Sequence, residues 1–199
     1  MSLDGLGNVF EDWVEDMPAY PCLEDLESMR LSIQEAEKNG EPYSNLFTRW
    51  MHSWYSDLGL VVLDASHPDL KSIAAGIFAK EISGNGVSCA VKQNDPAFVR
   101  DVNLFYAPIK SARVGVISDS KGQLKAGDEI LNPRGDSWEI WCKSNAASLS
   151  PSVLLRPLYQ ELLLSSSLVV VGPGEMRYWE QLKQGFAHFQ IAMPNVILR

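Results

Sequence analysis

One stretch of the chain, residues 149–189, constrains the fold more than any other. Its middle, Leu168–Val171, is apolar at every position, which is typical of a strand buried on both faces of a parallel sheet. A helical pattern precedes this strand, and a Gly-Pro-Gly turn (172–174) and an amphipathic helical pattern follow it. The order predicts a helix N-terminus at the carboxyl end of a buried strand. Ligands bind at that place in open α/β sheets.

Residues beside this turn are candidates for binding a substrate or nucleotide. Gly172 and Gly174 permit close approach of the backbone, and Glu175 falls in the first turn of the expected helix. An acidic residue there is also favourable simply because it faces the positive end of the helix dipole. Tyr178 follows one turn later, on a different side from the apolar stripe. The turn is no phosphate-binding P-loop, because no Gly-Lys-Ser/Thr follows it.

Arg156 and Gln160 belong to the helical pattern that precedes the strand. Pro157 favours a helix that begins close to it, with residues 150–156 extended or in a separate turn. A kinked helix from Pro151 is the alternative, and it would place Arg156 and Gln160 on one polar face. In both cases the Arg156 guanidinium needs an anionic partner. That partner is either an internal carboxylate, Glu161 or Glu175, or the carboxylate or phosphate of a ligand.

The earlier part of the chain predicts helices and one β–α–β unit. Residues 1–20 read as a loose lead-in, and helices are expected from Pro21 and from about Pro42. The aromatic stripe of the second helix favours core packing over a ligand box. Apolar residues 60–63 predict a buried parallel strand that ends at Asp64, followed by a helix from Pro68 and a strand over 87–91. Asp64 is a candidate for binding a ribose hydroxyl, or equally for capping the turn.

Residues of about 100–134 have a different character. Short apolar runs, among them one that contains Asn103, are separated by turn signals such as Ser-Asp-Ser-Lys-Gly (118–122). This pattern predicts a small insertion of antiparallel hairpins. We therefore expect an α/β fold that is Rossmann-like, with three layers, a mostly parallel sheet and this antiparallel insertion.

Composition excludes several classes of protein. The chain has 199 residues and a formal net charge of −8, without the basic cluster that nucleic-acid binding requires. The longest apolar runs, such as 58–63, are too short to cross a membrane, and no secretory signal is recognisable. Three separated cysteines and three isolated histidines predict neither a disulfide framework nor a metal site. We expect a cytoplasmic protein, and no catalytic residue is assigned.

Several motifs resemble those of one family. They are Ser-Pro-Ser-Val-Leu-Leu-Arg-Pro-Leu-Tyr-Gln (150–160), Val-Val-Val-Gly-Pro-Gly-Glu-Met-Arg-Tyr-Trp (169–179) and the closing Met-Pro-Asn-Val-Ile-Leu-Arg. Together they resemble the bacillithiol-biosynthesis cysteine-adding enzymes, which are cysteine ligases. The resemblance runs from about Tyr43 to Arg199, with supporting segments at 59–64 and 102–106.

The resemblance implies a function and also implies that this chain carries only part of the enzyme. It implies addition of cysteine to glucosaminyl malate, a small anionic substrate, by an enzyme with a Rossmann-like core. We expect residues 1–199 to be a single partial domain, the central to C-terminal part of that core, and to be inactive alone. The resemblance implies no cofactor held by this chain, although ATP or ADP is compatible with the full-length family, and it leaves a homodimer open. The alternative is a non-catalytic α/β domain for ligand binding or assembly.

Overall fold

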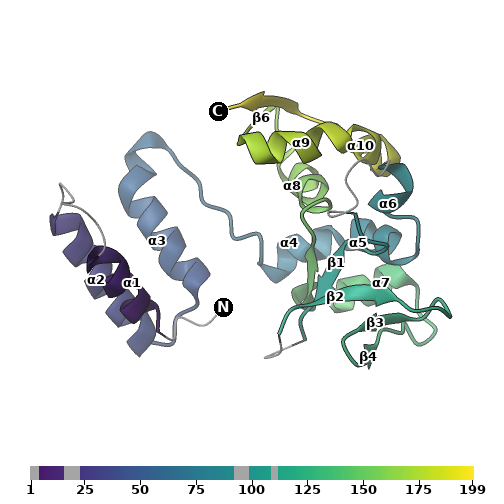
Figure 1. The fold of residues 1–199 in the computed structure, drawn as a ribbon, viewed down its shortest axis with the longest axis horizontal. Helices are drawn as coiled ribbons and strands as arrows, with labels where there is room; N and C mark the ends of the chain where they lie inside the picture. The colour runs from purple at the N-terminus through teal and green to yellow at the C-terminus, as the bar shows by residue number, and fades with distance from the viewer. Residues whose placement is uncertain (1–4, 16–22, 92–98, 109–111) are drawn as a thin grey trace. The chain divides into compact units, whose positions relative to one another are not determined.

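The computed structural model describes residues 5–15, 23–91, 99–108 and 112–199. The chain divides into two compact units, Met1–Asp64 and Ala65–Arg199 (Figure 1). The expectation of one domain over 1–199 stays a prediction. No helix among the described residues is long and apolar enough to cross a membrane.

The first unit holds three helices and a short 3₁₀ turn, and the second holds seven helices, one 3₁₀ turn and seven strands within the described ranges. In chain order they are α1 (Leu6–Glu15), α2 (Leu23–Lys38), α3 (Tyr43–Tyr55), η1 (Ser56–Leu58), α4 (Pro68–Ile73), α5 (Ala75–Ile82), α6 (Val87–Ala90), β1 (Leu104–Tyr106), β2 (Val114–Ser118), β3 (Leu124–Ala126), β4 (Glu129–Ile130), α7 (Trp138–Ser144), η2 (Ala146–Ser148), β5 (Leu149–Pro151), α8 (Arg156–Leu164), β6 (Leu168–Val171), α9 (Pro173–Gln181), α10 (Lys183–Phe189) and β7 (Asn195–Leu198).

Helices α1, α2 and α3 pack around a small core of their own. Phe10 of α1, Ile33 of α2 and Leu46 of α3 are buried against one another. The expected loose lead-in is therefore wrong for Leu6–Glu15, because Leu6, Phe10 and Val14 recur at four-residue spacing and form one apolar face. The helices expected from Pro21 and Pro42 are confirmed as α2 and α3.

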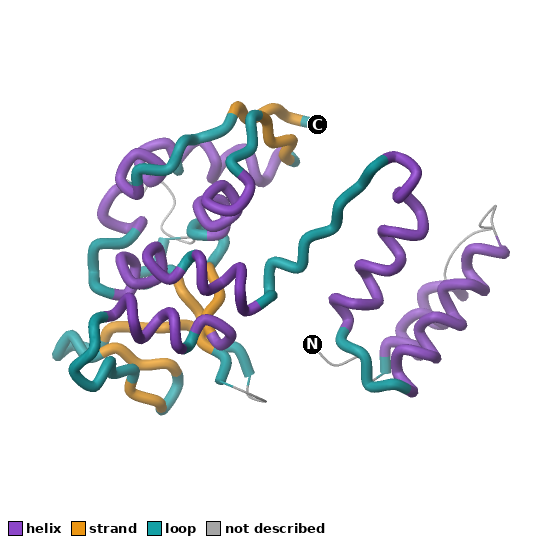
Figure 2. The backbone as a smooth tube through the Cα atoms, turned by 180° about the vertical axis from the view of Figure 1, so that it is seen from behind, coloured by secondary structure: helices purple, strands orange, loops and turns teal. Residues whose placement is uncertain are grey.

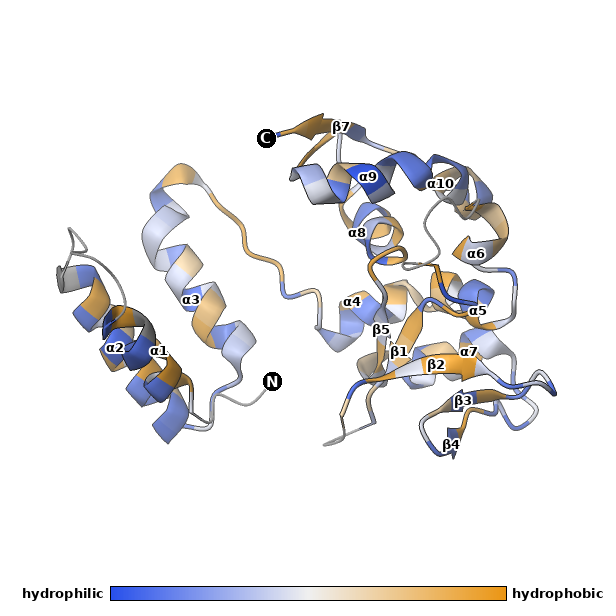
Figure 3. Ribbon diagram, in the orientation of Figure 1, coloured by the Kyte–Doolittle hydropathy of each residue, from blue (hydrophilic) through white to orange (hydrophobic). Residues whose placement is uncertain are grey.

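The end of the first unit departs from the expected strand. Residues 60–64 pair with no described strand, and the Val61 side chain is 84% exposed. The apolar character of this segment is visible in Figure 3. The prediction of a buried parallel strand there is wrong, because apolar residues alone provide no neighbouring strand for the backbone to bond. The stripe of α3 is also only partly packed: Leu46 is buried, whereas Phe47 and Trp54 remain exposed.

The main sheet of the second unit is antiparallel. Its strand order is β4-β3-β2-β1-β5, and every pairing within it is antiparallel. The expectation of a mostly parallel sheet is wrong, whereas antiparallel hairpins over 100–134 are confirmed. Short turns explain this, since parallel neighbours need long crossover connections. Helices α5 and α7 cover one face of the sheet and share its largest apolar core (Figure 2).

The β–α–β unit expected before this sheet is also absent from the described residues. The helix from Pro68 is divided into α4 and α5, and Val87–Ala90 is helix α6, not a strand. Val87 and Val91 then lie on one side of a helical turn. There they pack in a second core with Leu158 of α8 and Phe186 of α10.

The strand, turn and helix at residues 168–181 are confirmed as β6, Gly172 and α9. Among the described strands, β6 pairs with β7 alone, in parallel, with Val169 opposite Val196. The strand is not buried on both faces, since Leu168 and Val170 are 51% and 57% exposed. A strand in a two-stranded pair lacks the neighbours that would cover its second face. Val171, at its carboxyl end, is buried against α9.

Candidate functional site

The turn after β6 is organised by Glu175. The Gly172 N–H donates to Oε2 of Glu175 at 2.9 Å, and the Tyr178 hydroxyl donates to Oε1 at 3.4 Å. Glu175 thus caps the first turn of α9 by accepting the N–H of the N-cap residue, which is one half of a capping box and a common structural role for an acid there. Burial and the neighbouring Glu175 charge raise the pKa of Tyr178, and Arg156 partly opposes this.

Arg156 begins helix α8, and Pro157 occupies the first turn, so the helix that starts near Pro157 is the correct alternative. Its guanidinium is exposed and pairs with no carboxylate among the described residues. The two internal partners considered for it are engaged elsewhere. Buried Glu161 accepts from the Ser166 N–H at 2.8 Å and from Gln160 Nε2 at 3.0 Å. Gln160 is therefore committed to Glu161, while Arg156 is left facing solvent near Tyr178.

Two further arginines, Arg100 and Arg113, belong to the surroundings of Arg156. The Arg113 guanidinium lies 3.9 Å from the centre of the Phe105 ring, and the Arg100 guanidinium lies 5.0 Å from it. Antiparallel pairing sets Phe105 of β1 opposite Gly115 of β2. A side chain at Gly115 would come within 2.9 Å of Arg100 Nη1, so the glycine makes room for this arginine.

The charges of Arg156 and Arg100 both act on Arg113. Burial lowers the pKa of Arg113, and the charges of Arg156 and Arg100 lower it further. Arg113 donates to the Pro151 carbonyl at 3.1 Å, which ties it to strand β5. Arg100, Arg113 and Arg156 are called the arginine cluster below. Arg100 and Arg113 were not predicted, because they are distant in sequence and only strand pairing brings them together.

Asn103 lies inside the protein and not on a binding surface. Its side chain is fully buried, and its Nδ2 donates to Glu81 at 3.0 Å and to the Arg100 carbonyl at 2.9 Å. Its Oδ1 accepts from the Ser152 hydroxyl at 3.3 Å. Asn103 therefore orients the backbone that carries Arg100. Glu81, which sequence reasoning missed, could have been noticed because it follows Ile77 and Phe78 at helical spacing, on their apolar side.

The remaining predicted site residues are placed as follows. Gly172 is buried, whereas Gly174 is exposed with open space around it. Asp64 is the last residue of the first unit and follows no strand, so its expected place at a strand end is wrong. No group of three or more metal-ligating side chains occurs within the described ranges.

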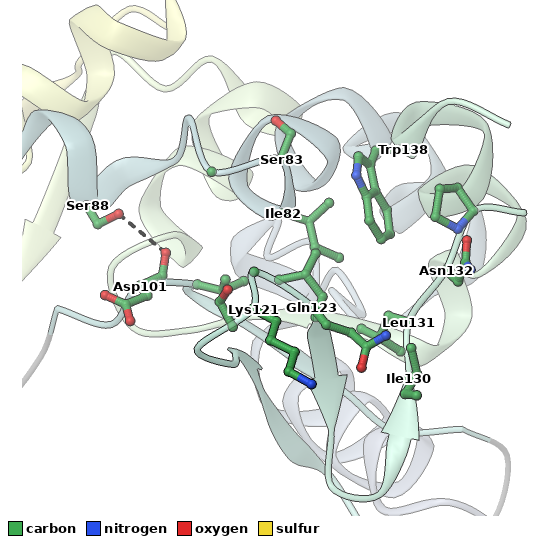
Figure 4. Close-up of a pocket in the computed structure, with 16 residues that line it drawn as sticks. Ile82, Ser83, Ser88, Asp101, Lys121, Gln123, Ile130, Leu131, Asn132 and Trp138 are labelled. Carbon is green, nitrogen blue, oxygen red and sulfur yellow. Dashed lines mark hydrogen bonds between the residues drawn. The ribbon is translucent and has the colours of Figure 1, made fainter. Parts of the chain in front are cut away.

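A groove of about 700 Å³ lies elsewhere in the second unit (Figure 4). It is bounded by the end of α5, by the β2–β3 hairpin and by Trp138 at the start of α7. None of the predicted site residues lines it, nor does any member of the arginine cluster. The groove and the cluster share no residue, although Asp101 of the groove directly follows Arg100 in the chain.

The order of strand, turn and helix places the chain in a class of proteins. The turn that ends β6 and the first turns of α8 and α9 carry Arg156 and Glu175. They belong to an α/β fold that is Rossmann-like although its main sheet is antiparallel. Comparison with known families agrees. Residues 2–199 match the model described as "Bacillithiol biosynthesis BshC, N-terminal Rossmann-like domain".

The chain belongs to the BshC family, as its motifs indicated. The match begins at residue 2, so it extends further toward the N-terminus than the expected start near Tyr43. That the chain is the central to C-terminal part of the core stays a prediction, because the matching model describes an N-terminal domain without saying which part is present.

Curated relatives give the same family. Proteins named "Putative cysteine ligase BshC" are 25% identical in Bacillus cytotoxicus and 26% identical in Oceanobacillus iheyensis, and each match covers 94% of this chain and 37% of the relative. The relative from Chlorobaculum tepidum is 28% identical over 84% of this chain and 32% of its own length. The chain therefore spans about a third of the length of these relatives.

Proposed function

We propose that this chain is part of an enzyme that joins cysteine to glucosaminyl malate and that it supplies a surface for the anionic substrate. The proposal is supported by family membership and by the printed name of the relatives. Because the chain covers only 37% of those relatives, we expect it to bind but not to convert the substrate alone. A cytoplasmic location is part of the proposal, since the family's named role is biosynthetic.

One observation carries the assignment of a site. Arg156 lies exposed beside the turn that follows β6, and both carboxylates that could have neutralised it accept hydrogen bonds from other groups. A guanidinium pairs well with a planar carboxylate, in which two oxygens accept two N–H donors. We therefore assign Arg156 to a carboxylate of the substrate, and Gly172, Glu175 and Tyr178 to the rim of the same site.

Glu175 and Tyr178 are proposed to orient a hydroxyl or amine of the substrate. Glu175 and Tyr178 are bonded to each other, so a substrate hydroxyl or amine would have to share the Glu175 carboxylate. No described residue is assigned as a general base. ATP or ADP, which the family resemblance allows for the longer protein, has no binding residue assigned in this chain.

The activity is tested on the longest protein that the gene encodes. Conversion of glucosaminyl malate in the presence of cysteine is followed by mass spectrometry, with and without ATP. The expected product carries the mass of both reactants less one water. Absence of this product from a folded, full-length protein under both conditions would overturn the ligase assignment and leave the alternative, a non-catalytic ligand-binding domain.

The role of Arg156 is tested separately on the 199-residue chain. Malate should raise the melting temperature of the wild type, and Arg156→Ala should lose most of that shift. Arg177→Ala is the matched control, because Arg177 is also exposed and lies on the neighbouring helix α9 without a described ion pair. Equal shifts in the wild type and Arg156→Ala would refute the assignment.

A further inference from the structure

The arginine cluster offers more positive charge than a single carboxylate needs. The chain has a formal net charge of −8, because acidic residues outnumber basic ones. In such a chain an arginine is expected to have a carboxylate close by. Arg30 and Arg49, in the first unit, do form such pairs with glutamates. Arg100, Arg113 and Arg156 form none with a carboxylate of the described ranges, and all three side chains are exposed.

The structure keeps these charges together at a cost. The guanidiniums of Arg113 and Arg100 lie 3.9 Å and 5.0 Å from the centre of the Phe105 ring. Both carry a positive charge, and like charges repel. The ring attracts both cations through its electron-rich face and so fixes them at one place. Gly115 leaves space for Arg100, and the Pro151 carbonyl holds Arg113.

No carboxylate of the described ranges forms an ion pair with a member of the cluster. The two oxygens of Glu175, in the turn after β6, accept from Gly172 and Tyr178 and not from Arg156. Burial is the largest cause of the lowered pKa of Arg113, and the charges of Arg156 and Arg100 lower it further. A positive field of this kind is relieved when an anion binds.

We propose that Arg100 and Arg113 complete, with Arg156, a binding site for a small anion that carries two or more negative charges. The inference deepens the proposed function and rests on it for the location of the substrate site. It adds Arg100 and Arg113 as residues that determine specificity, because their two charges favour a ligand with two or more negative charges over a ligand with one. Dicarboxylates and phosphate both have the required chemistry.

The experiment measures binding to the 199-residue chain by calorimetry at constant ionic strength. The probes are succinate, with two carboxylates, butyrate, with one, and inorganic phosphate. Succinate or phosphate should bind at least about tenfold more tightly than butyrate. Preference for succinate assigns a polycarboxylate, and preference for phosphate assigns a phosphorylated ligand. Equal binding of all three probes, or binding of none, overturns the proposal.

Variants locate the site. Arg100→Ala and Arg113→Ala should each weaken binding of the preferred dianion about tenfold and reduce its advantage over butyrate. Arg113→Lys keeps the charge but loses the planar group over Phe105, so it should bind with intermediate affinity. Arg177→Ala should bind like the wild type. Unchanged affinity in Arg100→Ala and Arg113→Ala would refute their role.

Melting without ligand separates a binding role from a structural one. Because the substitutions relieve repulsion, Arg100→Ala should melt within about 2 °C of the wild type or above it. A large loss of stability, together with unchanged affinity in the folded fraction, would show that the arginine is structural. The result is independent of catalysis: a full-length protein that lacks ligase activity can still prefer dianions, and an active one can lack this preference.

Discussion

The buried carboxylate of Glu81 is the feature of this structure whose removal has the best-defined consequence. It is fully buried in the second unit and has no cationic partner among the described salt bridges. Its oxygens accept from the Val87 N–H at 2.7 Å, from the Asn103 N–H at 2.7 Å and from Asn103 Nδ2 at 3.0 Å. The carboxylate thus joins α5, the start of α6 and the segment before β1.

Glu81→Ala would leave three buried donors without an acceptor. Each unsatisfied buried donor costs about 1–3 kcal/mol, and water that enters the vacated space offsets part of the sum. We expect the free energy of unfolding of the second unit to fall by about 3 kcal/mol or more. Glu81→Gln should cost about 1–3 kcal/mol, because one of its two terminal groups is an NH₂ that faces an N–H donor.

Urea denaturation followed by circular dichroism and tryptophan fluorescence measures these changes. Glu180→Gln is the control, since Glu180 is exposed on α9 and has no described ion pair, and it should unfold like the wild type. A loss smaller than about 1 kcal/mol in Glu81→Ala would contradict the reasoning, because it would mean that water replaces the carboxylate at no cost.

The same group predicts a pH dependence. Burial, the largest influence, raises the pKa of Glu81, although the N–H groups of Val87 and Asn103 oppose it. The folded protein therefore binds this proton more tightly than the unfolded chain. Above the folded-state pKa, the ionised Glu81 carboxylate lowers the free energy of unfolding. This loss disappears as the pH falls from the folded-state pKa to the ordinary glutamate pKa, so the free energy of unfolding should rise as the pH falls through that window. Glu81→Gln should lack this component. Identical pH profiles in both proteins would refute it.

Two further predictions concern space and accessibility. Gly86→Ala should lower the free energy of unfolding by about 1–3 kcal/mol, because the added methyl would collide with the Glu81 carboxylate. Gly174→Ala, the control, places its methyl in open space and should change the free energy of unfolding by less than about 1 kcal/mol. Coinciding denaturation curves for the two variants would contradict this. Burial raises the pKa of Cys142 to about 12, whereas Cys89 is exposed. In the folded protein, Cys89 should therefore react with a thiol reagent at pH 8, and Cys142 should react only after unfolding. Mass spectrometry of labelled peptides locates the modified thiols, and rapid labelling of Cys142 in the folded protein would contradict its buried position.

Local signals in the sequence predicted part of this fold correctly. Pro157 located the start of α8, Gly172–Glu175 marked the junction of β6 and α9, and turn residues at 118–122 indicated antiparallel hairpins. Each depends on dihedral preferences or capping within a few residues, which the chain encodes directly. Motifs at 150–179 also identified the family, although only about a third of the relatives' length is present.

Strand pairing could not be predicted in the same way. An apolar run such as 60–63 is compatible with a buried strand, but a strand forms only where a second one bonds to it, and none of the described strands does. Val87–Val91 shows the same ambiguity, since a short apolar run also fits one buried turn of helix.

For the site, the sequence by itself predicted an anionic partner for Arg156, either an internal carboxylate or a ligand, and it determined the turn after β6. Only the tertiary structure decided that this partner is neither Glu161 nor Glu175, that Asn103 is buried, and that Arg100 and Arg113 join Arg156. The physical reason is distance along the chain. Capping and turn formation act between neighbouring residues, whereas the arginine cluster exists because antiparallel pairing of β1 with β2 and β5 brings charges from three separate segments to one aromatic ring and its surroundings.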